Sequence, residues 1–396
     1  MTDFQIGILS LIKSAITGEK AVIGQNFDWD KALQLADKHK VLLLVYYGLY
    51  HTGITLPPEK QEHFKDMVCN LVMIDQRQHA ALEKLTTCFN ENHISHMPLK
   101  GSVLKSIYPK SEMRRMGDLD ILVDMEQADE IRSLMQSLGF EEQYDELHEW
   151  AWKKKKVKVE LHKQLVDPEN RLFAQYYQTA WQRALPTSQE KPYTFRLSDE
   201  DFFVHLFTHF AKHFYIKGIG LQHAVDLWVY ERAKPNLDHE YILAEFEKLH
   251  LATFYKRVHE TLQVWFEGKE PTEASELISQ KIFCDGVYGK SENFMMYEAF
   301  HKTGQDSGSH GDHVRLRAYW VLLFPNFTEM KIRYPILGKA PFLLPVFWVA
   351  RPFQILFTKK DVLEYRKNYA KNLTAENVAS RQKMIDLLGL EFESEE

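Results

Sequence analysis

The chain has 396 residues, enough for two or three domains at roughly 100–200 residues each. Its content of 45% hydrophobic and 26% charged residues is ordinary for a globular protein, and it excludes wholesale disorder, collagen-like repeats and a pure coiled coil. The formal net charge of −6 lacks the basic surplus of proteins that hold duplex nucleic acid through many phosphate contacts. Nucleic acid is therefore disfavoured as the main partner.

Three features bear on the compartment. The 3 cysteines lie far apart in the sequence, so neither a disulfide framework nor a zinc cluster is indicated. The first residues lack the basic segment and the cleavage site of a secretory signal. The most membrane-like stretch, Ala340–Phe357, contains three prolines and Arg351, and its uncharged part is shorter than the ~20 residues that span a bilayer. We expect a cytoplasmic protein without a transmembrane segment.

Residues 1–92 have the pattern of helices. The segment Phe27–Asp30 is suited to start a helix, because Ala32, Leu33 and Ala36 follow it at helical spacing. After the break at Pro57 and Pro58, a long periodic segment runs from Glu59 to about Asn92. These patterns predict an N-terminal helical region.

Residues 93–185 change to an alternation of short strands and helices. The pattern predicts, in chain order, a strand entering a glycine turn, a short helix, a strand, a second helix and a further strand. The corresponding segments are His96–Ser102, Val103–Tyr108, Gly117–Asp124, Met125–Leu138 and Val157–His162. We expect a compact α/β core here.

Residues 186–396 are expected to be mainly helical. Leu185–Arg196, with two prolines and many polar residues, has the composition of a linker. Ser198 and Asp201 then have the spacing of a helix-starting capping box, with Asp where Glu or Gln is usual. The whole chain therefore has the pattern of an α+β protein, in which a small mixed-sheet core is flanked by N- and C-terminal helical regions.

Three carboxylates of the core point to metal chemistry. Asp118 and Asp120 are two residues apart on a predicted strand, so they project from one face and repel each other unless a cation lies between them. Glu160 lies on the polar side of a later strand. If the two strands are neighbours, all three acids converge into an oxygen-rich site of the kind that Mg²⁺ prefers.

A glycine turn before the first of these acids points to phosphate. Gly101 allows close approach to the main chain, and Ser102 adds a hydroxyl near a helix N-terminus. Taken alone, a pair of acids two residues apart is common on solvated strands, and a Gly-Ser pair is common in ordinary turns. Their order, followed by a third acid on an alternating strand, favours a nucleotide bound together with metal, where two metal ions promote in-line displacement at phosphorus.

These segments resemble the uncharacterised nucleotidyltransferase family of the polymerase-β-like superfamily. The matching segments are Leu99–Ser102, Tyr108-Pro109, Arg114–Val123 and Val159–His162. The resemblance implies that Asp118 and Asp120 are metal ligands, and that Glu160 is the third acid, a ligand that helps to deprotonate an acceptor hydroxyl. It implies further that Gly101 and Ser102 bind the triphosphate and that Lys100 and Arg114 neutralise its charge. His209 and Asp226, in flanking helical segments that also resemble the family, would line the cleft.

The resemblance also implies an activity. The expected reaction is the Mg²⁺- or Mn²⁺-dependent transfer of NMP from an NTP, with ATP favoured, to an unidentified acceptor hydroxyl, with release of pyrophosphate. A small molecule or a protein is favoured over nucleic acid as the acceptor. Two alternatives remain open: a non-catalytic nucleotide- or partner-binding module on the same fold, and a toxin–antitoxin-type enzyme acting on RNA or protein.

Two weaker patterns leave alternatives open as well. His205, His209 and His213 share one helix face, which is compatible with zinc binding, with a cleft wall or with ordinary packing. The run from Lys153 to Lys158 is compatible with a solvated hairpin or with attraction of a phosphorylated acceptor.

Overall fold

The computed structural model describes residues 1–168, 170–286, 327, 330, 334–338, 340–350 and 375–390. The chain divides into two compact units, of which the second comprises His213–Gly218 and Tyr288–Leu388. The first unit comprises Met1–Lys212, Ile219–Val287 and Gly389–Glu396, so the predicted regions 1–92 and 93–185 both lie within it. The boundaries at 92 and 185 stay predictions.

A seven-stranded mixed sheet forms the centre of the first unit, in the order β3-β4-β5-β2-β1-β7-β6. Strands β2 and β5 are parallel, as are β1 and β7, and the remaining neighbours are antiparallel. The strands are β1 (His96–Pro98), β2 (Leu119–Val123), β3 (Glu141–Asp145), β4 (Glu149–Lys154), β5 (Val157–His162), β6 (Leu185–Ser188) and β7 (Lys191–Arg196). The α+β class with a mixed sheet is thus confirmed.

The sequence predicts the inner strands and misses the outer ones. Strands β1, β2 and β5 lie within the predicted segments, and the helix after β2 ends before Gly139, whose φ of 77° is left-handed. The prediction names neither β3 nor β4. Most of β3 is exposed on both faces, so its residues show no alternation of polar and apolar side chains.

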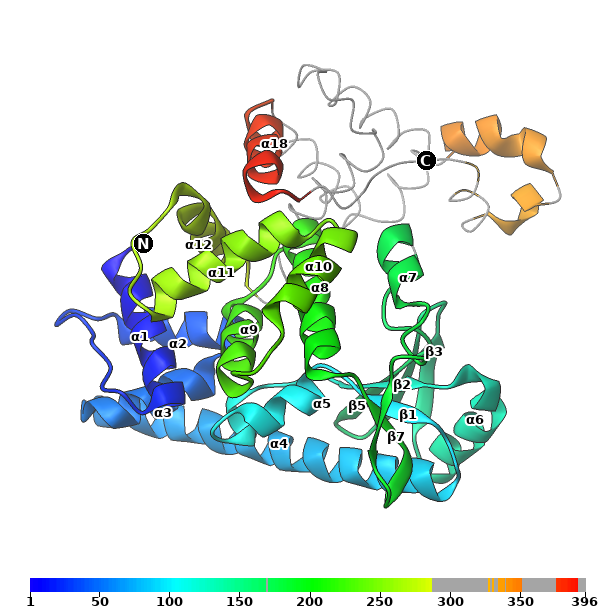
Figure 1. Ribbon diagram of the computed structural model, residues 1–396, viewed down its shortest axis with the longest axis horizontal. Helices are drawn as coiled ribbons and strands as arrows, with labels where there is room; N and C mark the ends of the chain where they lie inside the picture. Colours follow the sequence, from blue (N-terminus) through cyan, green and yellow to red (C-terminus); the bar gives the residue numbers. More distant parts are fainter. Residues whose placement is uncertain are drawn as a thin grey trace. The chain divides into compact units, whose positions relative to one another are not determined.

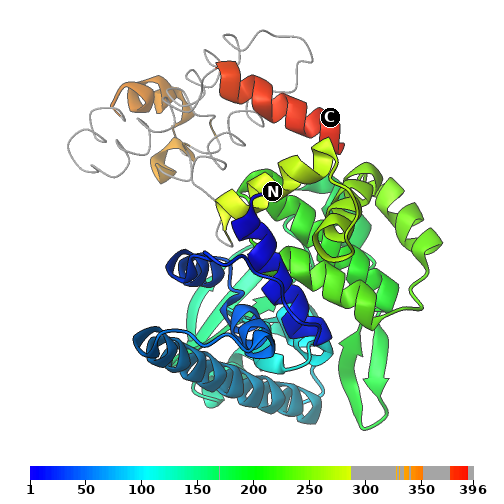
Figure 2. The same cartoon turned by 90° about the vertical axis from the view of Figure 1, so that its left-hand side faces the viewer.

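The predicted linker Leu185–Arg196 is wrong. This segment forms the β6–β7 hairpin, which extends from the first unit (Figure 2), and β7 pairs with β1 through His96 and Thr194. The hairpin lies at the edge of the sheet, where proline is tolerated in a strand. Its exposure explains the polar, proline-containing composition that resembles a linker.

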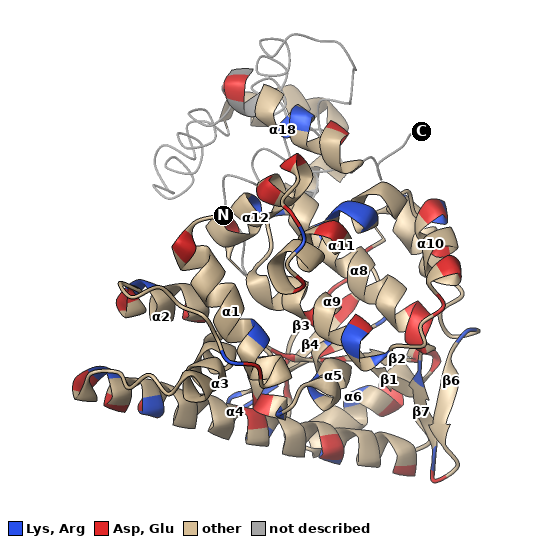
Figure 3. Ribbon diagram, turned by 60° about the vertical axis from the view of Figure 1, so that its left-hand side comes forward, with Lys and Arg blue, Asp and Glu red and all other residues tan. Residues whose placement is uncertain are grey.

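Helices surround this sheet. Asp28 caps α2, since its Oδ1 accepts a hydrogen bond of 3.1 Å from the Lys31 N–H, and α4 starts with Pro58 and continues for 34 residues. Basic and acidic residues are interspersed along α4 (Figure 3), in line with the absence of a basic surplus. The helices before the sheet are α1 (Asp3–Thr17), α2 (Trp29–Lys38), α3 (Leu42–Thr52) and α4 (Pro58–Glu91).

The remaining helices lie within or after the sheet segments. Ser198 caps α8 as predicted, because its Oγ accepts a 3.0 Å hydrogen bond from the Asp201 N–H. Helices of the first unit are α5 (Gly101–Leu104), α6 (Ala128–Ser137), α7 (Arg171–Tyr177), α9 (Leu221–Ala233), α10 (His239–Lys248), α11 (Ala252–Phe266) and α12 (Glu273–Asp285), while α8 (Asp199–Ile216) runs into the second unit. Short 3-10 turns cover Lys105–Ile107, Ser111–Met113 and Met125–Gln127.

The described elements of the second unit include α18 (Ala375–Leu388), the 3-10 turns Pro335–Gly338 and Pro341–Leu343, and helical residues 344–350. Arg381 of α18 donates a 2.9 Å hydrogen bond to the carbonyl oxygen of Tyr215. Among the described residues of the whole chain, no helix is long and apolar enough to cross a membrane.

One face of the sheet is buried against α4 and α6 (Figure 1). Leu119, Ile121 and Val123 of β2 join Val159 and Leu161 of β5 in this apolar core. Leu85 and Phe89 of α4, Ile131 and Met135 of α6, and Trp150 and Trp152 of β4 complete much of it. Because side chains alternate along a strand, the residues between these apolar ones, Asp120 and Glu160, project from the opposite face. The packing of the core therefore dictates which face carries the acids.

Candidate active site

The parallel pairing of β2 and β5 brings the predicted acids together. Asp120 stands opposite Glu160 in register, and Asp118 immediately precedes β2. Lys158 forms ion pairs with both Asp118, at 3.8 Å, and Glu160, so these two acids share one ammonium group. The three carboxylates thus belong to one cluster.

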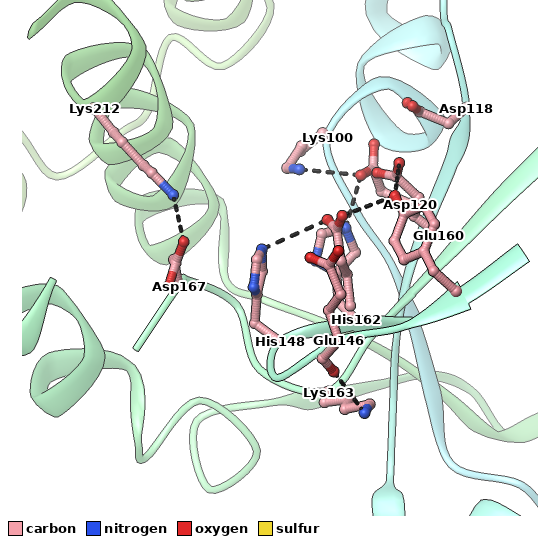
Figure 4. A network of polar contacts seen from close by, with 12 residues as sticks. Lys100, Asp118, Asp120, Glu146, His148, Glu160, His162, Lys163, Asp167 and Lys212 are labelled. Carbon is pink, nitrogen blue, oxygen red and sulfur yellow. Dashed lines mark hydrogen bonds and ion pairs between the residues drawn. The ribbon is translucent and has the colours of Figure 1, made fainter. Parts of the chain in front are cut away.

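Lys100 reaches this cluster from the end of β1 (Figure 4). Its Nζ donates a 3.0 Å hydrogen bond to Oδ1 of Asp120, while the N–H of Leu99 donates to the Asp120 carbonyl oxygen at 2.9 Å. The φ of Lys100 is 43°, in the left-handed region that side-chain-bearing residues rarely adopt. Such backbone strain gathers at functional sites. The turn that follows β1 therefore places the Lys100 ammonium group in contact with Asp120, a candidate metal ligand.

The cluster has more negative charge than its lysines balance. Burial, with the charges of Asp120 and Glu160, raises the pKa of Asp118 from 3.8 to about 6. Burial also opposes ionisation of Asp120, but the Lys100 ammonium and His162 hold its pKa well below the usual range. The pKa values of Asp118 and Asp120 are thus shifted in opposite directions. A bound cation would favour the ionised form of Asp118, which burial and the neighbouring acids disfavour.

His162 is a site residue that the sequence analysis did not nominate. Its Nε2 lies 2.8 Å from Oδ1 of Asp120, and the residue is buried at the end of β5. The signal was present in the sequence, because His162 follows Glu160 by two residues and therefore shares its polar strand face. The partner on β2, 42 positions away, becomes evident only in the fold.

A divalent metal fits the donors present here. One potential ligand atom from each of Asp120, Glu160 and His162 lies within 4.8 Å of the others. Carboxylate oxygens suit Mg²⁺ and Mn²⁺, and a histidine nitrogen is compatible with the latter. Asp118 adds a third carboxylate whose raised pKa indicates a need for positive charge. The donor set is therefore suited to a divalent ion held mainly by oxygen.

The glycine turn offers fewer phosphate donors than the sequence suggests. The N–H groups of Ser102 and Val103 donate to the carbonyl oxygens of Leu99 and Lys100, at 3.1 Å each. Ser102 Oγ is buried and, among the described residues, has no hydrogen-bond partner. At Gly101, an added Cβ would lie 2.7 Å from Nη1 of Arg114 and from the Met116 side chain. Alanine at this position would force the Arg114 or Met116 side chain to shift, so close packing favours glycine, and the Ser102 hydroxyl is one donor that the turn offers.

Arg114 and Asp226 form a buried ion pair. The Arg114 Nη2 lies 2.9 Å from Oδ2 of Asp226 and its Nε lies 3.2 Å from Oδ1, while Tyr108 donates to the same carboxylate at 2.7 Å. Arg114 was expected to neutralise a nucleotide and Asp226 to line a cleft. The structure places them together, joining the loop before β2 to α9, and both expected roles stay predictions.

The α8 histidines occupy different surroundings. His205 is buried, and burial with the nearby Lys100 lowers its pKa to about 3. The ring of His209 stacks 6.1 Å from that of His223 on α9, and its role as a cleft wall is untested. Within the described part of the chain, the converging group of metal-ligating side chains is Asp120, Glu160 and His162, and the α8 trio forms no such group.

The predicted basic run divides between surface and site. Lys153, Lys155 and Lys156 are exposed around the β4–β5 turn, where Lys155 has a φ of 54°. Lys158, farther along β5, points instead at the carboxylates. The hairpin expectation is confirmed, and one lysine of the run belongs to the candidate site.

One family model matches the chain. The family is described as uncharacterised nucleotidyltransferase, and the match extends over residues 25–267, more than half of the 396 residues. No curated protein and no solved structure matches the chain significantly. The matched region contains the sheet, the three carboxylates, Lys100 and His162, together with helices on both sides of them. The chain therefore belongs to the uncharacterised nucleotidyltransferase family.

Proposed function

We propose that this protein transfers NMP from an NTP, with ATP favoured, to an acceptor hydroxyl and releases pyrophosphate, using Mg²⁺ or Mn²⁺. The observation that carries the proposal is the register of β2 and β5, which sets Asp120 opposite Glu160 with Asp118 alongside. Family membership supports nucleotidyl transfer in general. The three free cysteines suit the reducing cytoplasm, where we place the reaction.

Each residue of the cluster has a task in this proposal. Asp118, Asp120 and Glu160 would hold the divalent ions, which supply charge neutralisation and activate the attacking oxygen. Glu160 would also accept the proton of the acceptor hydroxyl. Once cations compensate the acids, Lys100 would neutralise the triphosphate, and Ser102 Oγ, buried without a partner among the described residues, would donate to a phosphate oxygen. Gly101 would form part of the phosphate-binding turn, and Arg114 would provide a positive charge farther from the phosphates.

A cavity that begins farther along β2 than Asp120 supports a small acceptor. Its volume is about 260 Å³, and its lining includes Leu122, Lys163, Tyr177 and Trp181. Leu122 lies two residues after Asp120 on the same strand face, roughly 7 Å along β2. The lining mixes apolar side chains with Lys163, Gln164 and Gln178, and it contains no carboxylate. A small hydroxyl compound with an apolar part would fit this cavity.

The experiment is transfer of label from α-³²P-NTPs to acceptors in a lysate of the protein's own host, with Mg²⁺ or Mn²⁺ present. We expect wild-type protein to label one acceptor class and Asp120→Asn to label none. Asp129→Asn is the matched control, because it makes the same chemical change at an exposed position of α6, on the helix-covered side of the sheet. It should label as wild type does.

Two outcomes would contradict the proposal. Equal labelling by wild type and Asp120→Asn would remove the carboxylates from the mechanism. Calorimetric binding of Mg²⁺ and ATP without turnover on any acceptor would favour a nucleotide-binding module instead. Label found on RNA or on a protein side chain would identify the acceptor and support the toxin–antitoxin-type version of the same chemistry.

A further inference from the structure

The position of His162 is compatible with two roles, that of a metal ligand and that of a hydrogen-bond donor to Asp120. It ends β5, pairs in register with Leu122 of β2, and is 4% exposed. Its Nε2 lies 2.8 Å from Oδ1 of Asp120. At this distance the imidazole either shares a metal ion with Asp120 or donates a hydrogen bond to it, and its hydrogen-bonding pattern distinguishes between the two.

The second ring nitrogen decides the tautomer. His162 Nδ1 is buried and has no hydrogen-bond partner among the described residues. If Nε2 bound a metal through its lone pair, the ring proton would sit on Nδ1 and be buried as an unpaired donor. Buried N–H donors without a partner are rarer in proteins than buried acceptors without one. The proton therefore belongs on Nε2, where it is donated to Asp120.

This bond restricts how Asp120 can bind a cation. Oδ1 accepts from His162 at 2.8 Å and from Lys100 at 3.0 Å, so a donor on β5 and a donor in the turn after β1 hold one oxygen. The side chains of Lys100 and His162 are 17% and 5% exposed, and that of Asp120 is 10% exposed. Rotation of the carboxyl group would break both hydrogen bonds. Oδ2 is then the oxygen that Asp120 offers to a metal ion.

We propose that His162 is a positioning residue, which orients the Asp120 carboxylate for metal binding and is not itself a ligand. The inference rests on the proposed function, since it concerns the same metal site. Partners that orient a metal ligand typically change metal affinity by about 10- to 100-fold when they are removed. His162 should therefore matter for affinity through its Nε2–H group alone.

The test measures Mn²⁺ affinity of the full chain by electron paramagnetic resonance, with Mn²⁺ as the sole added ligand. His162→Gln keeps an N–H donor near the Nε2 position, and His162→Leu removes it. We expect Gln to bind as wild type does and Leu to bind about 10- to 100-fold more weakly. Pulsed measurements should show no directly coordinated ¹⁴N in wild type. If His162→Leu does not fold, His162→Asn replaces it, since its shorter amide does not reach Asp120.

Matched controls come from His96, a fully buried histidine of β1. Its nitrogens contact the Ile94 carbonyl oxygen at 2.9 Å and Thr194 Oγ1 at 3.1 Å, away from the carboxylates. His96→Gln and His96→Leu should leave Mn²⁺ affinity unchanged, whatever they do to stability. They separate a loss of orientation from a general loosening of the sheet.

Three results would overturn the inference. A coordinated ¹⁴N signal that disappears in both His162 variants would make His162 a ligand. Wild-type affinity in His162→Leu would leave it no role, while the proposed metal site stands. No Mn²⁺ binding by wild type at millimolar concentration would remove the metal site, and with it both the proposed function and this inference.

Discussion

Arg114 and Asp226 lie 112 positions apart and form a two-pronged ion pair in the interior, in which Asp226 is fully buried. Removing one partner leaves an uncompensated charge away from water. We expect Asp226→Asn to lower the free energy of unfolding by about 3–5 kcal/mol. Urea denaturation followed by circular dichroism measures this loss.

A neighbouring ion pair provides the control. Arg115 bonds to Asp37 at 2.7 Å, but Asp37 is 52% exposed. Exposed pairs contribute little, so Asp37→Asn should cost no more than about 1 kcal/mol. Similar losses in Asp226→Asn and Asp37→Asn would mean that the buried pair does not anchor the loop before β2.

Gly101→Ala tests whether packing requires this glycine. The new Cβ would lie 2.7 Å from Nη1 of Arg114 and from Met116. Arg114 cannot move freely, because Asp226 and the Arg115 carbonyl oxygen hold its guanidinium. Overpacking of this kind costs about 1–3 kcal/mol, measurable as a loss of unfolding free energy.

Gly24→Ala is the control for that substitution. A Cβ at Gly24 would meet nothing within 4 Å, and its φ is not positive, so alanine should be neutral or slightly stabilising there. Equal stability of Gly101→Ala and Gly24→Ala would show that the turn can relax. Normal stability with lost NTP binding would point to approach of a phosphate as the reason for glycine.

The sequence predicts those features of the fold that depend on the local alternation of polar and apolar residues. The alternation in 117–124 and 157–162 predicts β2 and β5, because one face of each strand is buried in the core. The same alternation places Asp120 and Glu160 on the polar face. Their convergence was conditional on the two strands being neighbours, which local pattern does not encode.

The parts that escaped prediction depend on partners remote in the chain. Arg114 looks like a free cation until α9 presents Asp226, and His162 looks like a surface histidine until β2 presents Asp120. The β6–β7 hairpin is exposed, so no buried face marks it as a pair of strands. Buried polar pairs and exposed edges carry no hydrophobic periodicity.

Acid should destabilise the protein through its buried histidines, and His39 gives a clean test. Burial, with the charge of Lys38, lowers its pKa from 6.5 to about 4, and its Nδ1 accepts a 3.2 Å hydrogen bond from the Leu221 N–H. The unfolded chain therefore binds a proton below pH 6.5 that the folded chain refuses until about pH 4. Each such group lowers the unfolding free energy by up to about 1.4 kcal/mol per pH unit in the middle of this window.

His39→Asn isolates this contribution. Asparagine keeps an acceptor for the Leu221 N–H but does not titrate. The unfolding free energy should therefore fall less for the variant than for wild type, by about 0.7 kcal/mol between pH 7 and 6 and by about 1.2 kcal/mol between pH 6 and 5. Parallel lines for wild type and variant would show that His39 is charged in the folded protein.

We expect the same substitution, Asp to Asn, to have opposite effects on stability at positions 118 and 120. Burial and its acidic neighbours raise the pKa of Asp118 to about 6, so its ionisation opposes folding above that pH. Lys100 and His162 hold the pKa of Asp120 low despite its burial, so its ionisation favours folding above pH 3.8 and that benefit is lost as pH falls below it. In metal-free buffer at pH 8, Asp118→Asn should stabilise the protein by roughly 0.5–2 kcal/mol. Asp120→Asn should destabilise it by about 3–5 kcal/mol.

The pH dependence and a metal titration complete the argument about Asp118. The stability that Asp118→Asn gains over wild type should shrink as pH falls from 6 towards 3.8, because wild-type Asp118 itself becomes neutral in that range. Added Mn²⁺ should stabilise wild type and remove the advantage of Asp118→Asn, since ligands stabilise the state that binds them. A variant that is less stable than wild type at pH 8 without metal would contradict this. The charges of Lys100 and Lys158 would then suffice to stabilise ionised Asp118 without a metal ion.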